Sequence, residues 1–188
     1  MDKTVPQGRV KGTLKPPCSK SYAQRALAAA LLSEEVSVLR NIEFCDDTRS
    51  ALSCIETLGA RVHQVDPTSL SIEGGLDPKG HVLNVGESGL STRLFTPIAS
   101  LCPTPITIEG RGSLLRRPMH MMFEPLRRLG VRVRDNEGYL PIEVCGPIQG
   151  GKVEVDGSVS SQFITGLLLA LPLARRDTIL HVDGAVST

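Results

Sequence analysis

Apolar residues along the chain alternate between helical spacing and strand spacing, and the order of these elements repeats itself. The first pass predicts a helix, a strand, a helix and two strands, over residues 21–32, 37–40, 47–58, 59–65 and 70–74. The second pass predicts a strand, a helix, a strand, a helix and a hairpin, over residues 81–85, 90–100, 105–109, 119–129 and 130–146. A third pass begins with a strand, a helix and a strand, over residues 152–157, 161–171 and 178–182. This order predicts an α/β (α+β) protein built from repeated units.

Two glycines mark equivalent places in the first two units. Gly59 in "IETLGARV" and Gly130 in "LRRLGVRV" each stand where a helix ends in a left-handed residue before a strand begins. The third unit stops after its second strand, with no second helix and no hairpin. We therefore expect the chain to be a fragment of a longer protein.

Composition narrows the function classes. The 188 residues are 40% hydrophobic, which is enough for an ordinary buried core, and the net charge is +1. With no Trp, two Tyr and no polybasic tail, the chain lacks the charge and stacking surface typical of nucleic-acid binding. No apolar run is long enough to span a bilayer, so we expect no membrane partner. The five cysteines are odd in number and form no CxxC pair, which favours a reducing cytoplasm.

The first helix of each unit begins in a segment rich in serine or glycine. These segments are "CSKSYAQR", "GESGLSTR" and "GSVSSQF". A helix N-terminus carries free N–H groups and a partial positive charge, so it can hold a phosphate or a carboxylate. Capping alone explains any one of them, because serine is favoured at that position for local stability. Three such starts facing one cleft would form a site for a polyanion.

Cations at these helix starts favour the anion-site interpretation. Lys20, Arg25 and Arg93 lie within two turns of a start, on helices that are otherwise apolar, and the two arginines occupy equivalent positions. Arginine suits forked recognition of carboxylate or phosphate, and lysine supplies a mobile point charge. The loop "GRGSLLRRPM" adds Arg117 ahead of a proline. Asp47, by contrast, is explained on the residues alone as a helix-capping carboxylate.

Several common catalytic motifs are absent from the sequence. There is no HExxH, GxxxxGK[ST], GxGxxG or GxSxG, and the four histidines are scattered. Zinc protease, nucleotide kinase, dinucleotide enzyme and serine hydrolase therefore lose their support, and we expect no metal site.

Four segments together resemble the 5-enolpyruvylshikimate-3-phosphate synthase (3-phosphoshikimate 1-carboxyvinyltransferase) family. They are "KPPCSKSYAQRALAAALL", "GESGLSTRLF", "LLRRPM" and "DGSVSSQFITGLLLALPLA", and their order and spacing agree over essentially the whole chain. The resemblance implies a two-domain enzyme of βαβαββ units, with helices inside and sheets outside. Residues 1–14 would be an N-terminal strand or interdomain segment, residues 15–188 would form most of one domain, and the second domain would be absent.

The resemblance also implies a reaction. The family moves the enolpyruvyl group of phosphoenolpyruvate to the 5-hydroxyl of shikimate 3-phosphate and releases phosphate, without metal or cofactor, in aromatic amino-acid (chorismate) biosynthesis. On this basis the partners are small-molecule substrates, and the full-length protein is expected to be a cytoplasmic monomer. The family's principal proton-transfer carboxylates lie in the missing half, so we expect this chain alone to be inactive.

The roles of individual residues follow from the same resemblance. Lys20 is expected to contact the phosphoenolpyruvate phosphate, and Asp47 matches an acidic position near the active site. The other matching positions are expected to bind substrate: Ser21 and Arg25 at the shikimate carboxylate, Gly89, Arg93 and Arg117 on the phosphoenolpyruvate side, Ser160 and Ser161 at the 3-phosphate, Gln162 between both substrates, and Ser187 or Thr188 at a further phosphate contact.

One segment departs from the family pattern. Where the family commonly has "NAGTA", this chain has "ESGLS", which places Glu87 and Leu90 at the anion site. If Glu87 points inward it should weaken phosphoenolpyruvate binding, unless the chain belongs to a variant subgroup with its own compensation. Sensitivity to glyphosate, which occupies this pocket in the family, stays open.

Two alternatives to this family are compatible with parts of the sequence. The sister family, UDP-N-acetylglucosamine enolpyruvyl transferase, typically has a Lys-Asn start and a loop cysteine, and neither is present here. The other alternative is a noncatalytic anion-binding fragment.

Overall fold

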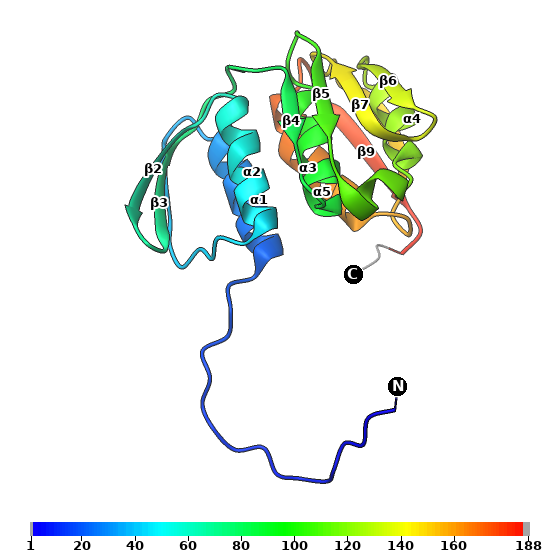
Figure 1. Cartoon of the computed structure of the whole chain (residues 1–188). Helices are drawn as coiled ribbons and strands as arrows, with labels where there is room; N and C mark the ends of the chain where they lie inside the picture. Colours follow the sequence, from blue (N-terminus) through cyan, green and yellow to red (C-terminus); the bar gives the residue numbers. More distant parts are fainter. Residues whose placement is uncertain (1, 186–188) are drawn as a thin grey trace.

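The computed structural model describes residues 2–185, and its helices lie between outward-facing sheets (Figure 1). The helices that meet in the middle are α1 (Lys20–Leu32), α2 (Asp46–Thr57), α3 (Gly89–Ala99) and α5 (Ser161–Ala170). The three serine- or glycine-rich segments thus contain the starts of α1, α3 and α5, which are all inner helices. The expected mixed α/β architecture is confirmed.

The sheets repeat a common pattern. The first is antiparallel in the order β1-β3-β2, from β1 (Val36–Leu39), β2 (Arg61–Asp66) and β3 (Ser69–Glu73). The second has the order β4-β5-β7-β6, from β4 (Val82–Asn84), β5 (Ile106–Glu109), β6 (Arg132–Asn136) and β7 (Tyr139–Cys145). The third pairs β8 (Gly151–Asp156) with β9 (Thr178–Asp183). Helix α3 joins the parallel pair β4–β5 as α5 joins the parallel pair β8–β9, which agrees with the repeat read from the sequence.

The glycine markers have the expected backbone conformation. Gly59 has φ of 123° after α2, and Gly130 has φ of 85° after α4 (Phe123–Arg128). A side chain is strained at such angles, so glycine is suited to ending each helix there.

The helix predicted over 119–129 is shorter than expected. The structure has a 3-10 turn, η2 (His120–Met122), followed by α4 (Phe123–Arg128). Met119 has ψ of 3° and its N–H donates to the carbonyl oxygen of Gly138 at 2.7 Å. With φ of -123°, Met119 lies outside the helical range, and its hydrogen bond ties it to the β6–β7 turn.

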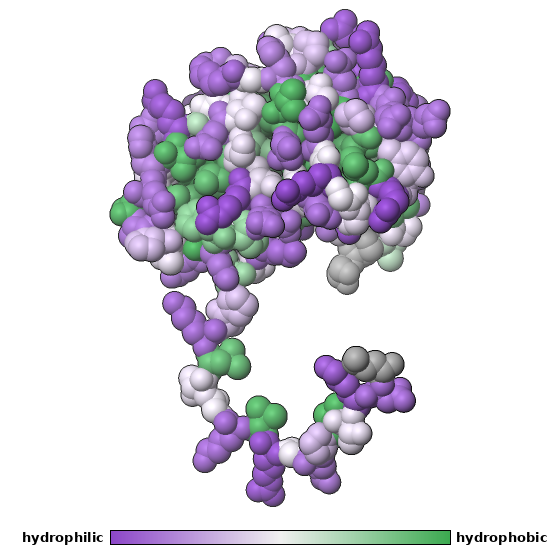
Figure 2. Space-filling model, in the orientation of Figure 1, coloured by the Kyte–Doolittle hydropathy of each residue, from purple (hydrophilic) through white to green (hydrophobic). Residues whose placement is uncertain are grey.

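The expected N-terminal strand is not formed in residues 2–14, which carry no helix or strand. They run away from the folded body as an exposed segment (Figures 1 and 2), and Val5, Val10 and Leu14 are fully or largely exposed. A strand needs a neighbouring strand for its backbone hydrogen bonds, and none of the three sheets includes one from this segment. An interdomain role for residues 1–14 stays a prediction.

Helix α3 is the most deeply buried element. Every residue from Gly89 to Ala99 except Arg93 is buried. Gly166 on α5 allows the closest approach, because a Cβ there would lie 2.5 Å from the carbonyl oxygen of Arg93. Pro97 has no N–H to donate to that carbonyl, so the helix interior leaves it open to the α5 backbone. The N-terminus of α3, with its free N–H groups, lines a polar pocket.

Candidate functional site

The starts of α1, α2, α3 and α5 meet at one polar pocket of about 460 Å³. Seven of the predicted site residues line it: Lys20, Ser21, Asp47, Gly89, Arg93, Arg117 and Gln162. They come from four helices and from the loop after β5, so residues more than a hundred positions apart share one cavity.

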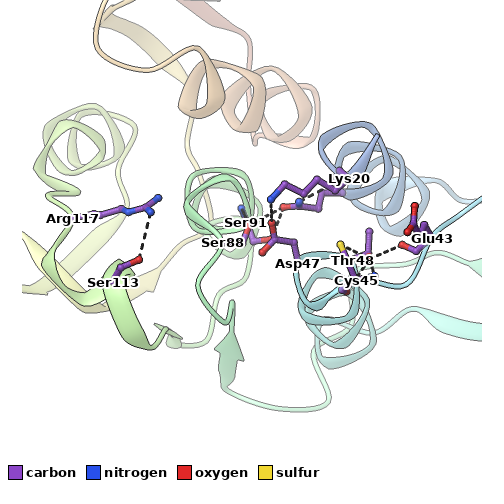
Figure 3. A network of polar contacts seen from close by, with 10 residues as sticks. Lys20, Glu43, Cys45, Asp47, Thr48, Ser88, Ser91, Ser113 and Arg117 are labelled. Carbon is purple, nitrogen blue, oxygen red and sulfur yellow. Dashed lines mark hydrogen bonds and ion pairs between the residues drawn. The ribbon is translucent and has the colours of Figure 1, made fainter. Parts of the chain in front are cut away.

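An ion pair joins α1 to α2 at this pocket. The Nζ atom of Lys20 lies 2.8 Å from Oδ2 of Asp47, and the contact is drawn in Figure 3. The Lys20 side chain is 64% exposed and that of Asp47 is 22% exposed. The hydrogen bond and the charge of Asp47 raise the pKa of Lys20, so the ammonium stays charged. Asp47 also lies in the first turn of α2, where a carboxylate complements the helix dipole as expected from the sequence.

Gln24 ties α1 to the beginning of α3. Its side chain is 1% exposed, and its Oε1 accepts hydrogen bonds from the hydroxyls of Ser88 and Ser91, each at 2.9 Å. Its Nε2 donates to the carbonyl oxygen of Lys20 at 3.3 Å. Ser88 in turn caps α3 by accepting from the N–H of Ser91 at 3.1 Å. The network sets the position of Lys20 relative to the α3 N-terminus (Figure 3).

Two arginines flank the first residue of α3. A Cβ on Gly89 would lie 2.8 Å from Nη1 of Arg93 and 3.3 Å from Nη1 of Arg117. Burial, together with the charge of Arg117, lowers the pKa of Arg93. Neither arginine forms an ion pair within residues 2–185, and the buried Nε of Arg93 has no hydrogen-bond partner there. Two neighbouring cations with unused donors form a site that an anion would complete.

The loop after β5 brings Arg117 to this place. The segment η1 (Gly112–Arg116) is a 3-10 turn whose Leu114 is fully buried. The Glu87 carboxylate accepts hydrogen bonds from the N–H of Ser113 at 3.1 Å and from its hydroxyl at 3.3 Å. Glu87 therefore lines the pocket but has partners on the loop.

Three predicted residues among those described lie outside the pocket lining. Ser160 is buried and caps α5, its Oγ accepting from the N–H of Phe163 at 3.2 Å, while Ser161 is half-buried beside it. Arg25 is also half-buried, and its Nη1 donates to the carbonyl oxygen of Ser21 at 3.0 Å. Ser187, like the alternative Thr188, lies outside the described residues.

Sequence reasoning missed Gln24 and Ser88. A signal for Gln24 was present, because it occupies the same helical face as Leu27, Ala28 and Leu31, at the i, i+3, i+4, i+7 spacing of the buried side. A polar residue on such a face requires buried partners. Its partners Ser88 and Ser91 stand in the serine-rich start "GESGLSTR", but no local signal pairs them with Gln24.

The pocket is lined by cations and by small polar side chains, which suit the binding of an anion. Among residues 2–185 no group of three or more His, Cys, Asp or Glu side chains is arranged to hold a metal ion. Nor does any helix of that part of the chain have the length and apolar character needed to cross a membrane. All five cysteines are free.

Comparison with known proteins assigns the family. The family model described as EPSP synthase (3-phosphoshikimate 1-carboxyvinyltransferase) matches residues 5–188, almost the whole chain. The chain belongs to the EPSP synthase family. The resemblance drawn from the four sequence segments is thereby confirmed.

Curated relatives carry the name of the same family. The 3-phosphoshikimate 1-carboxyvinyltransferase of Methanocorpusculum labreanum is 37% identical over 182 residues, which cover 95% of this chain and 43% of the relative. That of Methanothermobacter thermautotrophicus is 40% identical over 177 residues, covering 92% of this chain and 42% of the relative. The chain thus spans less than half the length of these EPSP synthase relatives.

Solved structures agree on the fold. An EPSP synthase from Acinetobacter baumannii superposes with a TM-score of 0.82 at 24% sequence identity, covering 94% of this chain and 41% of that one. At this identity the likeness supports the enolpyruvyl transferase fold alone.

Proposed function

We propose that the protein takes part in transferring the enolpyruvyl group of phosphoenolpyruvate to the 5-hydroxyl of shikimate 3-phosphate, with release of phosphate. The observation that carries this proposal is the pair Arg93 and Arg117, whose guanidinium groups meet at Gly89 with no carboxylate partner among the described residues. Membership of the EPSP synthase family supplies the reaction class.

Phosphoenolpyruvate suits this end of the pocket. It carries a phosphate and a carboxylate, and two forked guanidinium groups can each bind one of them. The N-terminus of α3 adds free N–H groups and a partial positive charge. Gly89 leaves room for the ligand because its missing side chain would occupy the space between the arginines.

Shikimate 3-phosphate would lie toward α1 and α5. Ser21 and Arg25 stand at the start of α1 for its carboxylate, Ser160 and Ser161 at the start of α5 for its phosphate, and Gln162 reaches the pocket from α5. The hydroxyl of Ser160 caps its own helix and can still donate its proton outward.

Lys20 suits the chemical step. The 5-hydroxyl loses its proton as its oxygen adds to C2 of phosphoenolpyruvate, and C3 gains a proton. Loss of phosphate from C2 with a proton from C3 then gives the enol ether. Each stage is rich in negative charge. An ammonium that Asp47 keeps protonated offers preorganised stabilisation of the phosphate oxygens.

The proposal includes the setting of the reaction. We place the protein in the cytoplasm, where five free thiols are compatible with reducing conditions, and we propose a monomer acting on small molecules.

An NMR titration of the isotopically labelled chain tests the proposal. Shikimate 3-phosphate should shift the amides of Ser21, Arg25 and Ser161, and phosphoenolpyruvate those of Gly89 and Arg93. Inorganic phosphate should leave Ser21 and Arg25 unshifted, because it has neither the ring nor the carboxylate that would reach α1. Shifts identical for all three ligands would contradict substrate recognition and leave a simple anion site.

Two arginine variants give the matched control. Arg117→Ala should weaken phosphoenolpyruvate binding at least about tenfold, as expected for loss of a charge-assisted contact. Arg111→Ala removes the same charge from an exposed place on the same loop, outside the pocket lining, and should change binding little. Equal effects of both would show only a nonspecific attraction to positive charge.

A further inference from the structure

The Glu87 carboxylate packs directly against the backbone of the η1 turn. It accepts hydrogen bonds from the N–H and hydroxyl of Ser113 at 3.1 and 3.3 Å. Gly112, the residue before Ser113, has φ of 60°, and a Cβ there would lie 2.4 Å from the carboxyl carbon of Glu87. Only glycine satisfies both the backbone angle and the close approach. Both residues are therefore needed for the contact: Glu87 supplies the carboxylate, and Gly112 leaves the space that the carboxylate occupies.

Ser113 also connects Glu87 to Arg117 through hydrogen bonds. The Ser113 hydroxyl that donates to Glu87 also accepts from Nη2 of Arg117 at 3.5 Å, a contact drawn in Figure 3. Arg117 follows η1 directly, its side chain is exposed, and no carboxylate of the described chain pairs with it. Its direction therefore depends on the turn that carries it. The apolar side of that turn is held by buried Leu114, and its polar side by Glu87.

We infer that Glu87 is a positioning residue that fixes the η1 turn so that Arg117 meets Arg93 at the anion pocket. This role deepens the proposed function and rests on it, because the pocket must bind an anion for the position of Arg117 to matter. Glu87 acts through Ser113 and needs no contact with the ligand. The role gives a physical reason for an acidic residue beside an anion site, which the sequence alone presents as a conflict.

Positioning and simple electrostatics predict opposite results. If Glu87 only repelled the ligand, Glu87→Ala would strengthen anion binding, because a negative charge near the pocket would be gone. If Glu87 fixes the turn, Glu87→Ala should weaken binding, because Arg117 would lose its direction. Glu87→Gln keeps an oxygen acceptor for the Ser113 N–H without the charge, so it should preserve the turn.

The test measures inorganic phosphate and phosphoenolpyruvate binding by calorimetry for wild type, Glu87→Gln and Glu87→Ala. We expect Glu87→Gln to bind at least as tightly as wild type, and Glu87→Ala to bind about tenfold more weakly than Glu87→Gln. In an Arg117→Ala background the two Glu87 variants should bind equally, because the residue they position is gone. Glu109→Ala removes an exposed carboxylate outside the pocket, and it is the control for the loss of one negative charge from the protein. Binding by Glu87→Ala as tight as by Glu87→Gln would overturn the inference.

A ligand-free measurement separates this inference from the proposed function. Hydrogen exchange of the Ser113 amide should be at least about tenfold faster in Glu87→Ala than in wild type or Glu87→Gln, because the carboxylate acceptor is lost. Unchanged exchange at Ser113 would overturn the positioning role, whatever the binding data. Faster exchange with no anion binding by wild type would support the contact between Glu87 and the turn, and would overturn the proposed function together with the purpose assigned to Glu87.

Discussion

The ammonium of Lys20 lies 2.8 Å from the carboxylate of Asp47, so that the first turns of α1 and α2 meet through an ion pair at the edge of the anion pocket. The pair is largely open to solvent on the lysine side. Its geometry keeps a positive charge available at a fixed place, while Asp47 limits how freely that charge can bind another anion. Substitution of Lys20 and substitution of Asp47 should therefore have different effects on ligand binding, with little effect on stability.

Lys20→Ala and Asp47→Asn should each change the free energy of unfolding by less than about 1 kcal/mol, because exposed ion pairs contribute little. Binding of phosphoenolpyruvate should weaken in Lys20→Ala, which removes a cation from the pocket. In Asp47→Asn the binding of inorganic phosphate should become tighter, since Lys20 loses its competing partner. Urea denaturation and calorimetric titration measure the two quantities. If either variant lowered the free energy of unfolding by several kcal/mol, the ion pair would instead have a structural role.

Gln24→Leu should destabilise the fold by roughly 1–3 kcal/mol, because the hydroxyls of Ser88 and Ser91 would lose their buried acceptor. The variant should also loosen the α3 N-terminus, which hydrogen exchange of the Ser91 amide can detect. Gln64→Leu makes the same substitution at an exposed strand position and should change stability by no more than about 0.5 kcal/mol. Similar denaturation midpoints for the two variants would show that the network contributes little.

The elements that could be predicted from sequence are those with a local cause. Gly59 and Gly130 end their helices with positive φ because that conformation is encoded at one residue. The helix predicted over 119–129 is in fact a 3-10 turn followed by a short α-helix, and its first residue bonds to Gly138, nineteen positions away on the turn of a hairpin. Local spacing contains no information about that hydrogen bond.

The same distinction applies to the site. The serine-rich helix starts and the arginines were visible as local patterns, and the structure brings most of them to one pocket. The contacts that organise the pocket are long-range: Gln24 meets α3, and Glu87 after β4 meets Ser113 after the neighbouring parallel strand β5. Because these partners are set by helix packing and sheet order, single-sequence reasoning could name Glu87 as a conflict but could not find its partner.

The buried thiol of Cys54 should make stability depend on alkaline pH. Its side chain is 1% exposed, and burial raises its pKa from 9.0 to about 12. The folded state keeps the thiol neutral, whereas the unfolded state loses the proton near pH 9. The stability that this thiol contributes is therefore complete below pH 9 and is lost progressively as pH rises toward 12. The expected loss is about 1.4 kcal/mol per pH unit above 9. Cys54→Ala should show a shallower decline in urea denaturation between pH 8 and 10.5, and parallel declines in the two proteins would contradict the assignment.

Two glycines on facing helices should respond differently to the same substitution. At Gly89 an added Cβ would meet Nη1 of Arg93 at 2.8 Å and Nη1 of Arg117 at 3.3 Å, which are the mobile ends of long side chains. They can move aside, so Gly89→Ala should leave the free energy of unfolding within about 1 kcal/mol. The methyl group would nevertheless occupy the space between the guanidinium groups, and phosphoenolpyruvate should bind at least about tenfold more weakly.

At Gly166 the added Cβ would meet backbone, the carbonyl oxygen of Arg93 at 2.5 Å and Cα of Leu94 at 3.1 Å. Alanine gains about 1 kcal/mol over glycine inside a helix. Relieving the clash requires α5 to move away from the buried α3, and overpacking of this kind costs typically 1–3 kcal/mol, so the clash should outweigh the propensity gain. Gly166→Ala should therefore lower Tm while Gly89→Ala does not. The reverse order of Tm values would mean that α3 and α5 are not packed as described, and that the α3 N-terminus is not held at the pocket by this contact.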